Sequence, residues 1–127
     1  MKLLLDTNAL IWWLRDDPRL GPRVKQLIAD EESKILVSIV SLWEISMKWR
    51  VGKLEYAGST FLEALEAEEI EPLAIATDHL LALETLGMHH KDPFDHLIIA
   101  QAKVERAIII TSDREMAAYG VPCIGVD

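Results

Sequence analysis

Residues 1–10, MKLLLDTNAL, place three consecutive leucines directly before a carboxylate, Asp6. A short apolar run bounded by polar residues is typical of a buried β-strand, so Lys2–Leu5 is predicted to be the first strand. Similar runs recur along the chain, and segments with apolar residues at helical spacing lie between them. The other predicted strands are Ile35–Val37, Leu73–Ile75, Ala107–Ile110 and Pro122–Val126.

The segments between the strands have helical periodicity. Leu42, Ile45 and Trp49 share one helical face, which stops at Gly52, a residue suited to the position after a helix. This alternation predicts an α/β fold of three layers, α/β/α, with a central parallel sheet of about five strands and helices on both faces. The predicted helices are Asn8–Leu14, Leu20–Ile28, Leu42–Trp49, Thr60–Glu69, Asp78–Leu86 and Pro93–Arg106.

The composition of the 127 residues indicates one globular domain, residues 1–127, because no linker, repeat or low-complexity tract divides them. Half of the residues are apolar, yet no stretch reaches the length of a membrane span. The N-terminal apolar run is too short for a secretory signal, and Cys123 is the only cysteine. We therefore expect a cytoplasmic protein without a membrane association.

The net charge of −8 argues at first against a nucleic-acid partner, which normally requires a basic surface. The charge is unevenly distributed, however. Residues 54–90 contain eight acids and no lysine or arginine, whereas the rest of the chain balances at 13 acids and 13 bases. A surface built from the two ends of the chain is therefore neutral, and bound cations would make it attractive to phosphate.

Four acids are predicted to meet at the carboxyl edge of the sheet, where ligands bind in open parallel α/β folds. Asp6 follows the first strand and Asp113 follows the strand AIII. Glu44 lies in the first turns of one predicted helix, and Asp95 opens another. The topology predicts that these four side chains share one site, although their spacing in the sequence does not relate them.

Helix capping is the alternative explanation for the same acids. The segments Ser41–Glu44, Asp92–Asp95 and Ser112–Glu115 each place an acid three residues after a capping residue. Asp6 or Thr7 could likewise cap the first helix. Capping accounts for each acid singly, whereas a shared site accounts for all four together, and both explanations stay open at this point.

Four neighbouring carboxylates require a counter-charge, because two of them about 4 Å apart repel by about 4 kcal/mol at an effective dielectric of 20. Oxygen ligands favour Mg²⁺ or Mn²⁺, and one or two such ions could activate water and stabilise a phosphodiester leaving group. A zinc site is disfavoured because the histidines lack the paired spacing of a zinc finger and Cys123 stands alone. The histidines are His79, His89, His90 and His96.

The order of motifs resembles the PIN-domain ribonucleases, in particular the VapC-type toxins of toxin-antitoxin pairs. The shared features are DTNAL after the first strand, WEI and GKL in the middle, DPFD followed by LIIAQA, and the late TSD. The resemblance extends over essentially the whole chain. It implies a PIN-like fold and an endoribonuclease that depends on Mg²⁺ or Mn²⁺.

The resemblance also assigns roles to residues. It implies that Asp6, Glu44, Asp95 and Asp113 are the catalytic, metal-binding acids. A metal-activated water would then cleave RNA to leave a 5′-phosphate. His96 stands where the family often has arginine, so any contact of that arginine is in doubt here. Hydrogen-bonding support is expected from Thr7, Asn8, Thr111 and Ser112.

Substrate and partner contacts are predicted from residues near these motifs. Lys48, Lys53, Lys91 and Arg114 are the nearest bases and are expected either to steer phosphate or simply to be solvated. Ile11, Trp12 and Trp13 lie within an apolar run that passes right around a helix, so some of it must meet another helix or a partner. The family resemblance favours a cognate antitoxin and a homodimer.

Other functional classes fit less well. A phosphorelay receiver requires paired acids after the first strand and a late lysine, but Asp6 is followed by Thr7 and Asn8, and Pro122–Asp127 contains no lysine. A haloacid-type phosphatase would need its second aspartate at Asn8. A PIN-like module that binds RNA or protein without cutting is the remaining alternative.

Overall fold

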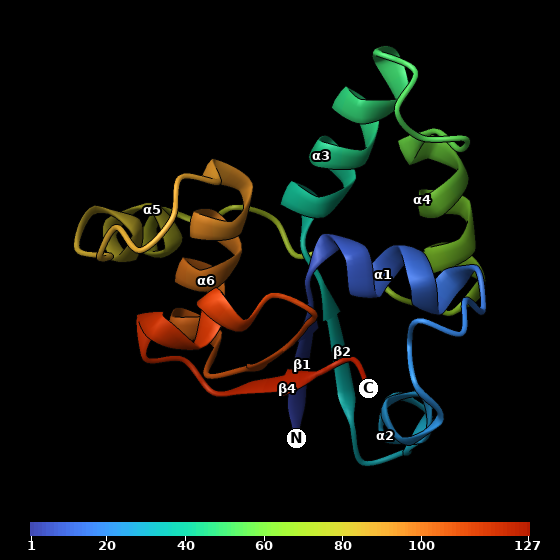
Figure 1. Cartoon of the computed structure of the whole chain (residues 1–127), viewed down its shortest axis with the longest axis horizontal. Coiled ribbons are helices and arrows are strands. Elements are labelled where there is room, and N and C mark those ends of the chain that lie inside the picture. The colour runs from blue at the N-terminus through green and yellow to red at the C-terminus, as the bar shows by residue number, and fades with distance from the viewer.

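The computed structural model describes residues 1–127 as a parallel sheet with helices on both faces (Figure 1). No helix in it is both long and apolar enough to cross a bilayer. In chain order the elements are β1 (Lys2–Leu5), α1 (Thr7–Leu14), α2 (Pro22–Ala29), β2 (Lys34–Val37), α3 (Ile39–Arg50), α4 (Gly58–Ala67), α5 (Thr77–Glu84), α6 (Pro93–Glu105), β3 (Ile108–Thr111), the 3₁₀-helix η1 (Arg114–Tyr119) and β4 (Cys123–Gly125).

The sheet has the strand order β2-β1-β3-β4, and all its strand pairs are parallel. The predicted parallel α/β architecture is confirmed. The predicted strand Leu73–Ile75 is reduced to a single parallel bridge between Leu73 and Ser38. Leu73 donates to Val37 O and accepts from Ile39 N, but the chain then leaves the sheet edge and Ile75 is exposed.

Strand β1 separates two apolar cores because its side chains alternate between the two faces of the sheet. Leu3 and Leu5 pack in the core formed with α1, α2 and α4, whereas Leu4 packs on the opposite face with α6 and η1. All three leucines are fully buried. Figure 1 shows α1, α2 and α4 on one side of the sheet and α5 and α6 on the other, which confirms the three layers.

Helix ends follow the sequence signals closely, with two corrections. Gly52, with φ of 76°, follows the last turn of α3 as predicted. Ser38, rather than Ser41, caps α3, because β2 ends at Val37 and the helix begins at once. Glu44 is consequently not in the first turn. Asp113, rather than Ser112, caps η1.

Candidate functional site

A polar pocket of about 220 Å³ lies at the carboxyl edge of the sheet, where β1 and β3 end. The four acids named from the sequence all line it, although they come from four separate parts of the chain. No apolar side chain contributes to the lining. The lining residues are Asp6, Thr7, Asn8, Glu44, Lys48, Asp92, Asp95, Ser112 and Asp113.

Asp6 both caps α1 and lines the pocket. Its Oδ1 atom accepts a hydrogen bond from Ala9 N at 2.8 Å. Burial raises the pKa of the Asp6 carboxyl, and the charges of Glu44 and Asp113 raise it further. The two explanations of Asp6 are therefore compatible, because one carboxylate oxygen caps α1 and the second oxygen remains free to face the pocket.

Glu44 is held from two sides although it is almost completely buried. The Thr7 hydroxyl donates to Glu44 Oε1 at 2.6 Å, and Lys48 Nζ donates to Oε2 at 2.7 Å. Ser41 Oγ lies 3.1 Å from the Thr7 hydroxyl and extends this network. Buried polar groups need such partners, so Thr7 and Lys48 explain how α3 can present a buried carboxyl group to the pocket.

Asp95 lies on α6, whose N-terminus is capped by Asp92. Burial raises the pKa of Asp95 to about 7, and repulsion from Asp92 and Asp6 adds to the increase, while a hydrogen bond from His90 opposes it. Across the pocket, Asp113 Oδ1 accepts from Glu115 N at 2.9 Å, and the Asp113 backbone N–H donates to Thr111 Oγ1. Asp113 therefore both caps η1 and lines the pocket, as Asp6 does for α1.

The predicted supporting and basic residues divide into two groups. Asn8 and Ser112 line the acidic pocket, as does Lys48, which is bonded to Glu44. Arg114 instead lines a neighbouring hollow of about 280 Å³ that shares Ser112 and Asp113. The exposed lysines Lys53 and Lys91 do not line the acidic pocket.

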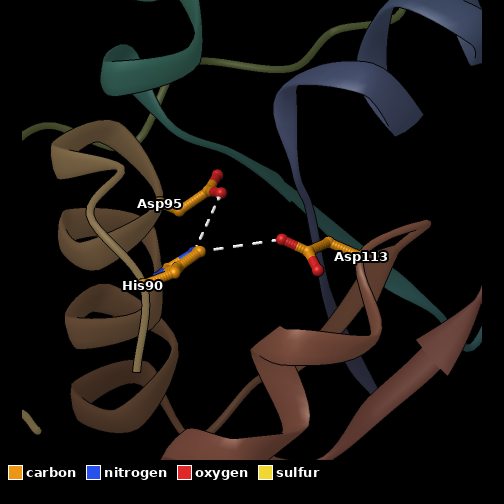
Figure 2. Close-up of side chains that lie close together, drawn as sticks. All are labelled: His90, Asp95 and Asp113. Atoms are coloured by element: carbon orange, nitrogen blue, oxygen red, sulfur yellow. Dashed lines mark hydrogen bonds and ion pairs between the residues drawn. The ribbon is translucent and has the colours of Figure 1, made fainter. Parts of the chain in front are cut away.

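Two residues of the site, one that lines the pocket and one that contacts its acids, are not predicted by the sequence patterns. Asp92 was considered only as a cap, yet it also lines the pocket. The spacing of His90 and the other histidines does not fit a zinc finger, but the Nε2 atom of His90 lies 3.3 Å from Asp95 Oδ2 and 3.9 Å from Asp113 Oδ2 (Figure 2). The sequence signal for both is their position in the loop directly before α6, whose start faces the carboxyl edge.

His96 points away from the acids although it is adjacent to Asp95. Its Nε2 atom lies 2.7 Å from His90 O and 3.0 Å from the Tyr119 hydroxyl, and the side chain is buried. This agrees with the expected 100° separation of neighbouring side chains on a helix. His96 therefore helps to hold the loop before α6 and does not face the pocket.

The apolar run on α1 is half-buried. Ile11, Trp12 and Trp13 all pack partly against the core on the α1 side of the sheet. Trp13 also lines a groove of about 650 Å³ together with Ile28 and Ile35. The run therefore packs partly against the core and is partly open at the groove, so cover by the following helix alone does not account for it.

The donor set fits a hard divalent cation. Carboxylate oxygens converge from four elements, the pocket holds no apolar side chain, and the raised pKa values of Asp6 and Asp95 indicate that negative charge is poorly compensated there. Lys48 is the only basic side chain lining the pocket, and Glu44 already engages it. A bound cation would offset the remaining repulsion.

The fold and the pocket together define an α/β protein with an acidic site at the carboxyl edge of a parallel sheet. The sequence matches the family model described as PIN domain over residues 3–122, and the chain therefore belongs to the PIN domain family. A comparison with curated proteins finds no match.

Solved structures with a similar fold include two VapBC structures and a toxin-antitoxin complex. VapBC2 from Rickettsia felis, bound to a promoter DNA fragment, has a TM-score of 0.74 at 17% identity, with 98% of each chain covered. DNA-bound VapBC from Salmonella typhimurium has a TM-score of 0.72 at 19% identity, covering 100% of this chain and 99% of that one. A toxin-antitoxin complex from Klebsiella pneumoniae has a TM-score of 0.66 at 22% identity, with 98% of each chain covered. At these identities the likeness establishes the fold.

Proposed function

We propose that residues 1–127 form a single PIN nuclease domain that cleaves RNA as a metal-dependent endoribonuclease and acts as the toxin of a toxin-antitoxin pair. The observation that carries the proposal is the pocket in which Asp6, Glu44, Asp95 and Asp113 meet at the carboxyl edge. Membership of the PIN family supports the same activity. The alternative, a PIN-like module that binds without cutting, is an outcome of the test below.

In this proposal the four acids hold one or two Mg²⁺ or Mn²⁺ ions. When bound, such an ion activates water for attack on phosphorus and offsets the charge of the phosphodiester. Thr7 fixes the orientation of Glu44, and Thr111 accepts a hydrogen bond from the Asp113 backbone N–H. Lys48 is the basic group placed to contact a phosphate at the pocket. Asn8 and Ser112, which also line the pocket, can donate hydrogen bonds to the RNA backbone.

The proposed partners are an antitoxin and a second copy of the chain. Three of the structures of similar fold are of VapBC or of a toxin-antitoxin complex, which supports an antitoxin as partner. The half-open groove beside Trp13 on α1 is the proposed place for an antitoxin segment, because the apolar side chains in its mixed lining, Trp13, Ile28 and Ile35 among them, would be covered on binding. Since its substrate would be cellular RNA, we propose that the protein acts in the cytoplasm.

Cleavage of a labelled single-stranded RNA panel tests the proposed activity. Antitoxin-free protein is assayed in EDTA, Mg²⁺ or Mn²⁺, alongside Asp6→Asn and the matched variant Asp78→Asn, whose side chain is exposed outside the pocket. Cutting should require metal, leave a 5′-phosphate, disappear in Asp6→Asn and persist in Asp78→Asn. RNA binding without cutting by folded wild type would favour the binding module, and 2′,3′-cyclic phosphate products would contradict attack by water.

A further inference from the structure

An imidazole from the loop before α6 contacts two of the acids that line the acidic pocket. Figure 2 shows His90 between Asp95 and Asp113, with its Nε2 atom 3.3 Å from one carboxylate oxygen and 3.9 Å from the other. The ligand atoms of these three residues all lie within 4.8 Å of one another. The site therefore contains a nitrogen donor as well as oxygen donors.

The spacing of these atoms suits a shared ion. Adjacent ligands of an octahedral cation are about 3 Å apart when each lies about 2.1 Å from the ion. The separation between His90 Nε2 and Asp95 Oδ2 is already close to that value, and Asp113 Oδ2 needs only a small movement. Asp113 is the most exposed of the three side chains, at 36%, so it has the freedom to make that movement.

The orientation of the His90 ring is fixed through its other ring nitrogen, Nδ1. Its Nδ1 atom lies 2.7 Å from the Tyr119 hydroxyl, which also accepts hydrogen bonds from the backbone N–H groups of His89 and His90. Tyr119 itself is buried in the core beside α6. Metal-ligating histidines usually donate their other ring N–H to an orienting partner, so ligation through Nε2 places the proton on Nδ1, with the Tyr119 oxygen as its acceptor.

We propose that His90 is a ligand of the divalent cation held by Asp95 and Asp113, and that its nitrogen makes the site favour Mn²⁺ over Mg²⁺. The proposal rests on the metal site of the proposed function. Imidazole suits transition-metal ions, whereas Mg²⁺ prefers oxygen donors and retained water. A site of oxygen donors alone would give Mn²⁺ less advantage.

A competing role for His90 is to donate a hydrogen bond to Asp95 without touching the ion. His90→Gln separates the two roles, because its amide reaches the position of Nε2 and can still donate, but it lacks the imidazole nitrogen. His89→Gln is the matched control: it changes the adjacent, exposed histidine, which is not part of the cluster with Asp95 and Asp113.

Pulsed electron paramagnetic resonance of Mn²⁺-loaded full chain, without RNA, gives the direct readout. Wild type and His89→Gln should show coupling of Mn²⁺ to an imidazole nitrogen, and His90→Gln should lose it. Protein grown with ¹⁵N-histidine should change the coupling from ¹⁴N to ¹⁵N, a test that needs no substitution. In parallel, His90→Gln should weaken Mn²⁺ binding about tenfold or more, and Mg²⁺ binding far less.

The outcomes separate this inference from the proposed function. Mn²⁺ bound to wild type, lost in Asp6→Asn but showing no histidine coupling, would overturn the role of His90 and leave the acidic metal site standing. Absence of Mn²⁺ binding by wild type, or binding that Asp6→Asn does not weaken, would overturn both. Melting of each variant in EDTA verifies that the compared chains are folded.

Discussion

Two regions of this molecule are rich in acids, and they differ in almost every physical respect. Residues 54–90 contain eight acids without a lysine or arginine, and all eight side chains are exposed. The pocket gathers fewer acids from scattered positions, but Asp6 and Glu44 in it are buried. Acid density along the sequence therefore does not identify a site. Convergence at the carboxyl edge of the sheet does, because burial and mutual repulsion create the demand for a cation.

The largest expected difference between the two regions is in catalysis. Glu44→Gln should lower RNA cleavage about a thousandfold, because metal assistance is worth several kcal/mol of transition-state stabilisation. Glu63→Gln, a matched change of an exposed acid on α4, should leave the initial rate within about twofold. Initial rates at saturating Mn²⁺ provide the comparison. Equal losses in the two variants would show that the pocket has no special role.

The second-largest expected difference between the two acidic regions is in the stabilisation of the fold by bound metal. Mn²⁺ at about 100 times its dissociation constant should stabilise the wild-type fold by about 2.7 kcal/mol. Glu63→Gln should keep this gain, and Asp6→Asn should lose most of it, although asparagine can still cap α1. Denaturant unfolding with and without Mn²⁺ measures the effect. A full gain in Asp6→Asn would place the ion elsewhere.

How far the sequence predicts this site depends on the kind of element that carries each residue. Asp6 and Asp113 follow apolar strands, and parallel topology obliges the ends of such strands to meet. Periodicity and motif resemblance together placed Glu44 and Asp95 on their helices. These four acids could therefore be named from the sequence, along with the strands and helices that carry them.

Residues in irregular segments could not be placed in this way. His90 and Asp92 lie in a loop whose path is set by contacts with Tyr119 and by the cap of α6, and no periodicity encodes these. The bridge at Leu73 and the cap at Ser38 depend on where β2 ends, which apolar content alone does not define. Sequence identifies regular elements well, and the tertiary contacts of the loops complete the site.

The pH dependence of stability should distinguish the regions by a smaller amount. Asp95 has a pKa of about 7 in the fold against an ordinary 3.8, so the folded state holds its proton more tightly than the unfolded state. This raised pKa makes the metal-free protein less stable as pH rises from about 4 through about 7. The loss should be about 1 to 2 kcal/mol, a figure reduced for solvent screening.

Asp95→Asn should remove this part of the pH dependence, whereas Glu63→Gln should retain it. Urea unfolding in EDTA at about pH 5 and about pH 8 measures the difference. If the stability of wild type does not fall between about pH 5 and about pH 8 relative to that of Asp95→Asn, then His90 and the surrounding solvent already compensate the charge of Asp95.

The smallest effect is expected when the exposed acids are neutralised. Glu63→Gln combined with Glu66→Gln removes two negative charges outside the pocket, which makes the chain less repulsive to RNA at long range. Screening limits this effect, because the Debye length is about 8 Å at physiological salt and about 30 Å at 0.01 M. RNA affinity, measured in the Asp6→Asn background to prevent cutting, should rise less than about twofold at physiological salt and more at low salt. A large increase that persists at high salt would mean that residues 54–90 contact RNA directly, and the distinction between a functional and a solvated acidic region would no longer hold.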